Sequence, residues 1–417
     1  MPLPWLAGNE MKRSAAYGLA VNYAGMMCLA IAINLLPVFL TTLSVDLGGP
    51  DGLTHEQLGR LAGITFAGLV AGILVSGPLA DRLGAKPFTV AGNVLIALGL
   101  ALLGVAPGYA TVCLAAFVMG IGAGILDMVL SPIVCAYRPE HRTAAMNWLH
   151  SFYCTGAVVT VLIGSLALRR GLGWRGLSLG LTLMPAGVAV AFVFMRMPAL
   201  GAEGGQRTRL RHLMRKPYFL VSLAAIFLGG ATEAGLAQWL PAYAEDSLGY
   251  TKWASGMSLL FFSLAMAVGR IAVGMAGHRV NPFTVLLGCC WGSAGLFVVG
   301  CFAPWPAVAL AGCMAVGVTG SCLWPSTLGV AADQFPRGGV SMFAMLAAVG
   351  NFGGVFMPWM VGVAADWTSM RWGLSTAMLC PLIMAFLLQW MRKAASAAGP
   401  LPPTSPTLAA ERARSEA

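Results

Sequence analysis

Long apolar runs separated by short polar breaks occupy almost the whole chain. A helix that crosses a lipid bilayer needs about 20 predominantly apolar residues. Runs of that length lie near residues 15–42, 58–79, 87–106, 110–136, 143–168, 174–196, 218–243, 254–275, 282–302, 306–332, 340–364 and 371–391. Charged residues and Gly, Pro or Asn turns separate them. The pattern predicts an all-α polytopic membrane protein with twelve transmembrane helices.

The composition favours the same class and excludes others. Hydrophobic residues make up 58% of the 417 residues and charged residues 10%, whereas a soluble domain carries about 25% charged residues. Hydrophobicity this high also excludes intrinsic disorder of the whole chain. The ten cysteines lie mostly inside apolar runs, with no CxxC pair and no Cys/His metal spacing. We therefore expect buried thiols, with neither a disulfide framework nor a metal site.

The positions of Lys and Arg explain the net charge of +10. With the N-terminus in the cytoplasm, 18 of these 25 residues fall in inner segments and 6 in outer segments, and Arg270 lies within a helix. Loops rich in Lys and Arg stay on the cytoplasmic side. Both termini are therefore predicted to lie in the cytoplasm of a bacterium, with the helices in its inner membrane. The excess of positive charge is explained by the orientation of the helices in the membrane, so no nucleic-acid partner is expected.

This topology is tested by labelling a cysteine introduced at Gln206, in the stretch between the sixth and seventh predicted helices. We expect a membrane-impermeant maleimide to label it in inverted membrane vesicles and not in intact cells, because the Lys/Arg bias places the stretch inside. Labelling from outside intact cells would contradict the predicted orientation.

Related motifs recur in the same order in the two halves of the chain. Gly120 and Pro139 are matched by Gly317 and Pro336, each 197 residues later. Such a repeat predicts two six-helix halves of parallel topology, with the substrate bound between them near the bilayer midplane. The predicted organisation is a cytoplasmic N-terminus (1–14), an N-terminal six-helix lobe (15–197), a cytoplasmic linker (198–216), a C-terminal six-helix lobe (217–393) and a disordered cytoplasmic tail (394–417).

The segment GPLADRLGAKPF at 77–88, between the second and third predicted helices, resembles the cytoplasmic loop motif G-x-L-A-D-R-x-G-R-K of the major facilitator superfamily. Ala85 replaces the first basic residue of the usual pair. The resemblance implies two pseudo-symmetric lobes that alternate access to a central site. Glycines suit a close helix approach and a tight turn, and a carboxylate suits a neighbouring helix N-terminus or a cation. The gating residues expected here are Gly77, Asp81, Arg82, Gly84 and Lys86.

Shorter patterns resemble the fucose–proton symporter branch of that superfamily and its sodium–glucose relatives. They are N-x-x-H on the fifth helix, E…W…Y on the seventh and Gly-Arg on the eighth, namely Asn147, His150, Glu233, Trp239, Tyr243, Gly269 and Arg270. This resemblance implies symport of a monosaccharide or a similar small polar solute, coupled to H⁺ or alternatively to Na⁺.

Ionisable residues within membrane helices are functional candidates because burying charge in lipid costs several kcal/mol. Asp127, His150, Glu233 and Arg270 meet that condition. Asp127 is the predicted proton-coupling carboxylate, with Glu233 as the second candidate, and Arg270 is assigned to pairing or gating. The alternatives are a buried Asp127 satisfied by another helix and a Glu233 held in an ion pair.

A sugar site needs paired donors and acceptors for hydroxyl groups and a flat aromatic face for the C–H side of the ring. Trp324 stands at the repeat position of Asp127 and is the predicted ring platform. Interhelical hydrogen bonding or helix packing is the alternative role for these side chains. The predicted substrate-binding residues are Asn22, Tyr23, Asn34, Asn147, His150, Gln238, Trp239, Trp324 and Asn351.

No catalytic motif or phosphate-cradling loop is present in the sequence. We therefore expect a monomeric secondary transporter, not an enzyme, with no cofactor, one small-molecule partner and the lipid bilayer as its surroundings. A proton-coupled exporter of small organic molecules, and a non-transporting sensor or lipid-handling protein on the same scaffold, are the rival readings, since a fold alone does not fix a function.

Overall fold

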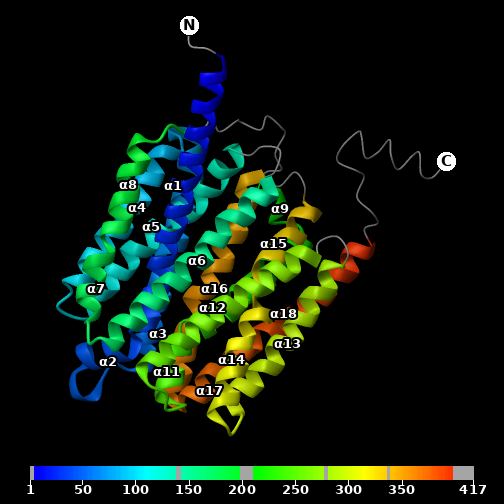
Figure 1. The fold of residues 1–417 in the computed structure, drawn as a ribbon. Coiled ribbons are helices and arrows are strands. Elements are labelled where there is room, and N and C mark those ends of the chain that lie inside the picture. The colour runs from blue at the N-terminus through cyan, green and yellow to red at the C-terminus, as the bar shows by residue number, and fades with distance from the viewer. Residues whose placement is uncertain (1–3, 138–141, 198–209, 277–279, 336–338, 398–417) are drawn as a thin grey trace.

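The computed structural model describes residues 4–137, 142–197, 210–276, 280–335 and 339–397. Within these ranges, twelve helical spans are long and apolar enough to cross a membrane, and each coincides with a predicted run (Figure 1). The spans of the first half are α1 (Pro4–Val38), α3 (His55–Leu83), α4 (Ala85–Gly104), α5 (Tyr109–Tyr137), α6 (Arg142–Arg169) and α7 with α8 (Trp174–Leu181, Leu183–Phe194). The spans of the second half are α10 with α11 (Pro217–Ala237, Leu240–Asp246), α12 (Lys252–Ala276), α13 (Pro282–Phe302), α14 with α15 (Pro306–Gly320, Leu323–Gln334), α16 (Gly339–Trp367) and α17 with α18 (Met370–Ser375, Leu379–Ala397). The predicted all-α twelve-span class is confirmed.

Two short α-helices and two 3-10 turns, η1 (Gly49–Asp51) and η4 (Thr376–Met378), complete the described chain. Helix α2 (Leu40–Gly48) follows α1, and α9 (Leu210–Leu213) lies in the predicted linker. Residues 198–209 of that linker and 398–417 of the predicted tail lie outside the described residues, so the predicted domain boundaries stay predictions. Helix α1 begins and α18 ends at the same end of the bundle (Figure 1), as an even number of spans requires.

Prolines follow the breaks in four of the spans, and the last of these is the 3-10 segment η4 that precedes Pro381 between α17 and α18. A proline has no N–H and its ring clashes with the carbonyl four residues earlier. Helix α7 ends at Leu181, four residues before Pro185, and α10 ends at Ala237, four residues before Pro241. Helix α14 ends at Gly320, with Ser321 four residues before Pro325. Irregular backbone in a membrane is tolerated where it lines a cavity, and the second and third of these breaks do.

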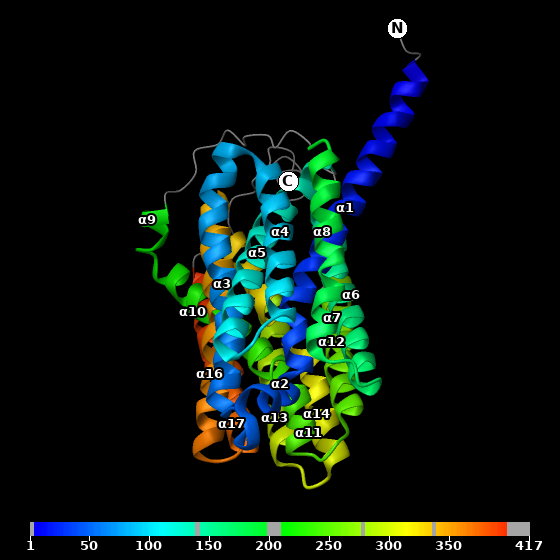
Figure 2. The same cartoon turned by 90° about the vertical axis from the view of Figure 1, so that its left-hand side faces the viewer.

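The two halves of the chain meet along two seams, α3 with α16 and α6 with α12. The first seam is close because a Cβ atom on Gly59 would overlap the carbonyl oxygen of Pro358. In the second, the guanidinium of Arg169 lies 5.4 Å from the centre of the Trp253 ring. Figure 2 shows α3 and α16 running side by side along one flank of the bundle.

Polar contacts between the lobes gather at the end of the bundle opposite the termini. Thr41 donates to the Oε2 atom of Glu245 at 2.7 Å, and Lys252 Nζ donates to Thr42 at 3.1 Å. The indole of Trp359 donates to Glu56 Oε1 at 2.7 Å. Among the described residues, no hydrogen bond or ion pair joins the lobes between the central cavity and the end that carries the termini. The contacts of Thr41, Lys252 and Trp359 close the bundle at the end opposite the termini.

Candidate substrate cavity between the lobes

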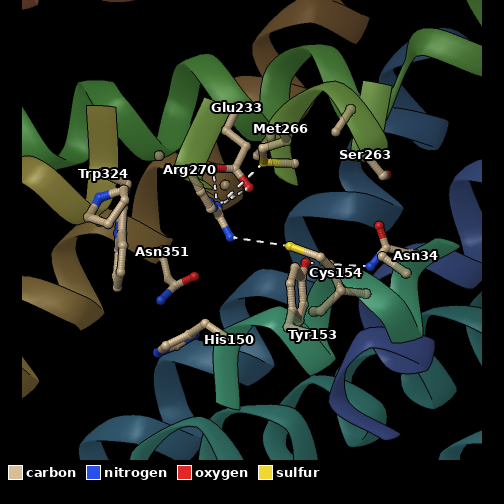
Figure 3. A pocket seen from close by; sticks show the side chains of 18 of the residues that line it. Asn34, His150, Tyr153, Cys154, Glu233, Ser263, Met266, Arg270, Trp324 and Asn351 are labelled. Atoms are coloured by element: carbon tan, nitrogen blue, oxygen red, sulfur yellow. Dashed lines mark hydrogen bonds and ion pairs between the residues drawn. The ribbon is translucent and has the colours of Figure 1, made fainter. Parts of the chain in front are cut away.

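A cavity of about 360 Å³ lies between the two lobes near the middle of the spans. Its wall is mixed, with apolar side chains such as Met26, Leu29 and Phe66 beside a set of polar groups. The polar and ionisable lining residues are Asn34, Asp127, His150, Tyr153 and Cys154 from the first half, and Glu233, Gln238, Ser263, Arg270, Cys322, Trp324, Ser326 and Asn351 from the second half. Most of them are shown in Figure 3.

Asp127 lies on α5 and faces this cavity. It is ten residues from the end of the helix at Tyr137, or about 15 Å along the axis. No described side chain makes a hydrogen bond or an ion pair with its carboxylate. The alternative was that a partner such as Arg270 satisfies Asp127. The described residues show no such partner, and Arg270 pairs with Glu233 instead.

Glu233 on α10 and Arg270 on α12 form an ion pair in the cavity wall. Arg270 Nη2 lies 3.4 Å from Oε1 and 3.3 Å from Oε2 of Glu233. Side chains on a helix lean toward its N-terminus, and Arg270 accordingly reaches back to the Sδ atom of Met266, one turn earlier, at 3.4 Å. This lean carries the long Arg270 side chain to the level of Glu233 (Figure 3).

A proline break supplies a further partner for Arg270. Pro325 has no N–H to give to the carbonyl of Ser321, four residues before it. Arg270 Nε donates to that carbonyl instead, at 3.3 Å. Pro241 leaves the carbonyl of Ala237 without its helical donor in the same way, and Ala237 lines the cavity. The breaks in α10–α11 and α14–α15 thus place backbone acceptors at the site.

The wall contributed by α6 is one face of that helix. His150, Tyr153, Cys154 and Ala157 line the cavity at the spacing i, i+3, i+4 and i+7, which puts them on one stripe. Tyr153 accepts a hydrogen bond of 3.4 Å from Asn34 Nδ2, and Arg270 Nη1 approaches the Sγ atom of Cys154 at 3.9 Å. We did not predict Tyr153 or Cys154 from the sequence, although the stripe that starts at His150 contains both.

Trp324, Asn351 and His150 lie together on another side of the cavity (Figure 3). Trp324 fits there because its neighbour on α16 is a glycine, and a Cβ atom on Gly350 would overlap the indole Nε1. Asn351 donates to the carbonyl of Ala347 at 3.0 Å. The predicted ring platform, Trp324, therefore faces the cavity in company with hydrogen-bonding side chains from both lobes.

Three of the predicted substrate residues lie outside the cavity lining. Asn22 is fully buried and donates to the carbonyl of Gly18 at 2.7 Å. Tyr23 stacks on Phe152 with 4.4 Å between ring centres. Trp239 is buried and donates to the carbonyl of Pro358 at 2.9 Å. Their side chains are used in packing and internal hydrogen bonds, which is the alternative weighed above for such residues.

The remaining predicted residues are only partly described. The side chain of Asn147 and the side chains of Asp81 and Arg82 lie outside the described residues. Gly84 forms the turn between α3 and α4 with a φ of +80°, a conformation that favours glycine. Lys86 lies in the first turn of α4 and is half-buried. The predicted gating roles of this loop stay predictions.

Comparison with known proteins gives the same fold and one family. The sequence profile of the Major Facilitator Superfamily matches residues 23–294. The probable nitrate/nitrite transporter NarK2 of Mycobacterium tuberculosis is 26% identical over 311 residues, which cover 71% of this chain and 76% of NarK2. The multidrug resistance protein MdtL of Vibrio parahaemolyticus is 25% identical over 65% of this chain and 70% of MdtL. The structure of the E. coli fucose:proton symporter FucP superposes with a TM-score of 0.65 and 18% identity, covering 91% of this chain and 99% of FucP.

Proposed function

The chain belongs to the major facilitator superfamily, and from that premise we propose that this transporter couples the movement of a monosaccharide or similar small polar solute to protons, in symport. Coupling would use no cofactor, and Na⁺ is the alternative ion. The proposed setting is a bacterial inner membrane with both termini in the cytoplasm, and the proposed transporting unit is one chain.

The observation that carries this proposal is a carboxylate without a described partner, Asp127, in a cavity that also holds neutral hydrogen-bonding groups and an indole. The cavity volume of about 360 Å³ lies near the lower end of the range for small-molecule sites, about 300–1,000 Å³. That size favours a small solute over a bulky drug. Asn34, Asn351 and Gln238 offer amide donors and acceptors for hydroxyl groups, and Trp324 offers a flat apolar face.

The cycle follows from the cost of charge in a membrane. An ionised Asp127 enclosed in a dry cavity is unfavourable, so closure of the lobes is favoured once the carboxylate has taken a proton. Proton and solute then enter together when the cavity opens outward and leave together when it opens inward. The seams α3–α16 and α6–α12 are the surfaces about which the lobes rock.

The relatives suggest a second candidate, export of small organic molecules in exchange for protons. MdtL is named for multidrug resistance, and the apolar part of the cavity wall, including Leu69 and Phe262, suits an apolar solute. The two candidates differ in the direction of proton movement. Adding solute outside makes the outside medium more alkaline in symport, because protons enter with the solute, and more acidic in antiport, because the entering solute drives protons out.

The proposed solute class is tested with the native thiol of Cys154, which lines the cavity. A panel of sugars, polyols, organic acids and drugs is first screened by thermal shift on the purified full chain. We expect a monosaccharide or polyol at ten times its Kd to slow alkylation of Cys154 roughly tenfold, because about one site in eleven then stays empty. Alkylation at each cysteine is read by peptide mass spectrometry.

Two controls accompany the measurement. Cys154→Ser identifies the signal of this thiol and separates it from that of Cys322, which also lines the cavity, and Cys113, which lies outside the lining, keeps its alkylation rate when solute is present. Protection by a drug or an inorganic anion alone, with none by any sugar or polyol, would overturn the proposed solute class.

A further inference from the structure

A carboxylate from the second half of the chain caps a helix of the first half. Asp366 lies one residue before the end of α16. Its Oδ1 atom accepts a hydrogen bond of 2.8 Å from the backbone N–H of His55, and its Oδ2 atom accepts one of 2.8 Å from the N–H of Glu56. These are the first two residues of α3. His55 Nδ1 also lies 2.9 Å from Oδ1.

Such a contact has a physical reason at this position. The first N–H groups of a helix have no partner within the helix, and the helix dipole attracts negative charge there. Thr54 and Gln57 form a capping box that satisfies part of this end from within the first half. Asp366 satisfies two further N–H groups, and it does so only while the two lobes are in contact.

Helices α3 and α16 approach each other closely next to this contact. Gly362 stands one helical turn before Asp366, and a Cβ atom there would overlap the carbonyl oxygen of His55. Trp359, a turn earlier still on the same face, donates to Glu56. Gly59 meets the carbonyl of Pro358. The approach of α16 to the start of α3 is thus continuous over two turns and ends at the carboxylate.

A similar local sequence, Gly-x-x-Ala-Asp, lies at the other end of the same helix pair. Residues 362–366 read Gly-Val-Ala-Ala-Asp and residues 77–81 read Gly-Pro-Leu-Ala-Asp, each at the C-terminal end of its helix. Helices α3 and α16 lie side by side and run in opposite directions (Figure 2). The segment 77–81 therefore lies at the end of the pair where α16 begins, at Gly339.

We propose that Asp366 is a positioning residue that holds the bundle closed at the end opposite the termini, by capping α3 across the lobe interface. This contact exists only while the two lobes meet at that end, so Asp366 sets the balance between the two access states without touching the solute. Asp81, which the loop motif already marks as a gating residue, stands at the equivalent position at the other end of the helix pair.

The first test is Asp366→Asn in the full chain, reconstituted in lipid nanodiscs and followed by hydrogen–deuterium exchange. Asparagine keeps the shape and loses the charge. We expect the access-state ratio to move roughly fivefold to thirtyfold toward opening at this end, which is the ratio that 1–2 kcal/mol supplies. Exchange should rise in peptides covering residues 52–58 and fall at the other end of the cavity, in residues 128–137 and 323–334.

The decrease in exchange at the far end of the cavity distinguishes a contact that holds one access state from a contact that only stabilises α3. A carboxylate that only stabilised the first turn of α3 would change exchange in residues 52–58 alone. The matched control is Asp46→Asn, because Asp46 accepts a hydrogen bond of 2.8 Å from Trp174 within one lobe at the same end of the bundle. We expect the control to alter exchange near residues 44–48 and 174 without any change across the cavity.

The second test restores the charge. Asp366→Glu, which keeps the negative charge, should restore most of the protection of residues 52–58. Exchange changes confined to α3 in Asp366→Asn would overturn the proposal. Neither measurement needs a solute, so the outcome is independent of the proposed function.

Discussion

Asp127→Asn is expected to abolish proton-driven accumulation of the solute while leaving solute exchange at equal pH partly intact. One pH unit corresponds to 1.36 kcal/mol, so a carrier that moves one proton with each solute supports about tenfold accumulation per unit of pH difference. The variant keeps the shape of the side chain and cannot titrate, so its accumulation ratio should fall to about one. The cavity-facing carboxylate without a described partner is the physical reason for choosing this residue.

The measurement is uptake of labelled solute into proteoliposomes at equal pH and with an imposed pH difference. Glu233→Gln on the same preparation serves as the comparison, since Glu233 is already paired with Arg270. A variant at Asp127 that still concentrates solute along the pH difference would show that the coupling group lies elsewhere, and Glu233 would become the next candidate.

The spans could be predicted from the sequence because length and hydropathy are local properties of each segment. The breaks inside them were not predicted, because an apolar run does not reveal a missing hydrogen bond. Pro185, Pro241 and Pro325 nevertheless carried that information, since each interrupts a helix four residues earlier. Two of those breaks shape the cavity wall, so the omission also hid part of the site.

Residues of the cavity wall could be predicted where an ionisable side chain lies within an apolar run. Asp127, His150, Glu233 and Arg270 stand out in apolar runs, and all four line the cavity. Neutral residues carry no such signal, because their role depends on the rotation of the helix. Gln238 and Trp239 are neighbours in the chain, yet only Gln238 lines the cavity and Trp239 packs against α16.

Contacts between the lobes could not be predicted at all from single positions. In the sequence, Asp366 is a polar residue at the end of an apolar run, and nothing local relates it to His55, 311 positions earlier. Only the pairing of α3 with α16 gives that carboxylate its partners. The repeat of Gly-x-x-Ala-Asp was visible in the sequence, but its meaning depends on knowing that both copies belong to one helix pair.

Arg270→Ala is expected to destabilise the protein more than the double variant Arg270→Ala/Glu233→Gln. The single change leaves the Glu233 carboxylate unpaired and the Ser321 carbonyl without its donor. Removing one partner of a fully buried pair costs about 3–5 kcal/mol, and here the cavity leaves the two side chains 25% and 22% exposed, so we expect about 1–3 kcal/mol. Replacing both partners removes the unpaired charge and recovers part of the loss. Thermal unfolding in nanodiscs measures the order of stability of the original protein, the single variant and the double variant.

The contribution of the freed carbonyl is separated by adding Pro325→Ala. Alanine supplies the N–H that proline lacks, so it can donate to Ser321 O within the helix. In the background of Arg270→Ala this change should raise the unfolding temperature, because an unsatisfied buried carbonyl costs about 1–3 kcal/mol. In the original protein, where Arg270 Nε already donates to Ser321 O at 3.3 Å, the gain should be smaller. Equal gains in both backgrounds would show that Arg270 does not serve the proline break, and that its place in the cavity wall rests on its other contacts, chiefly the ion pair with Glu233.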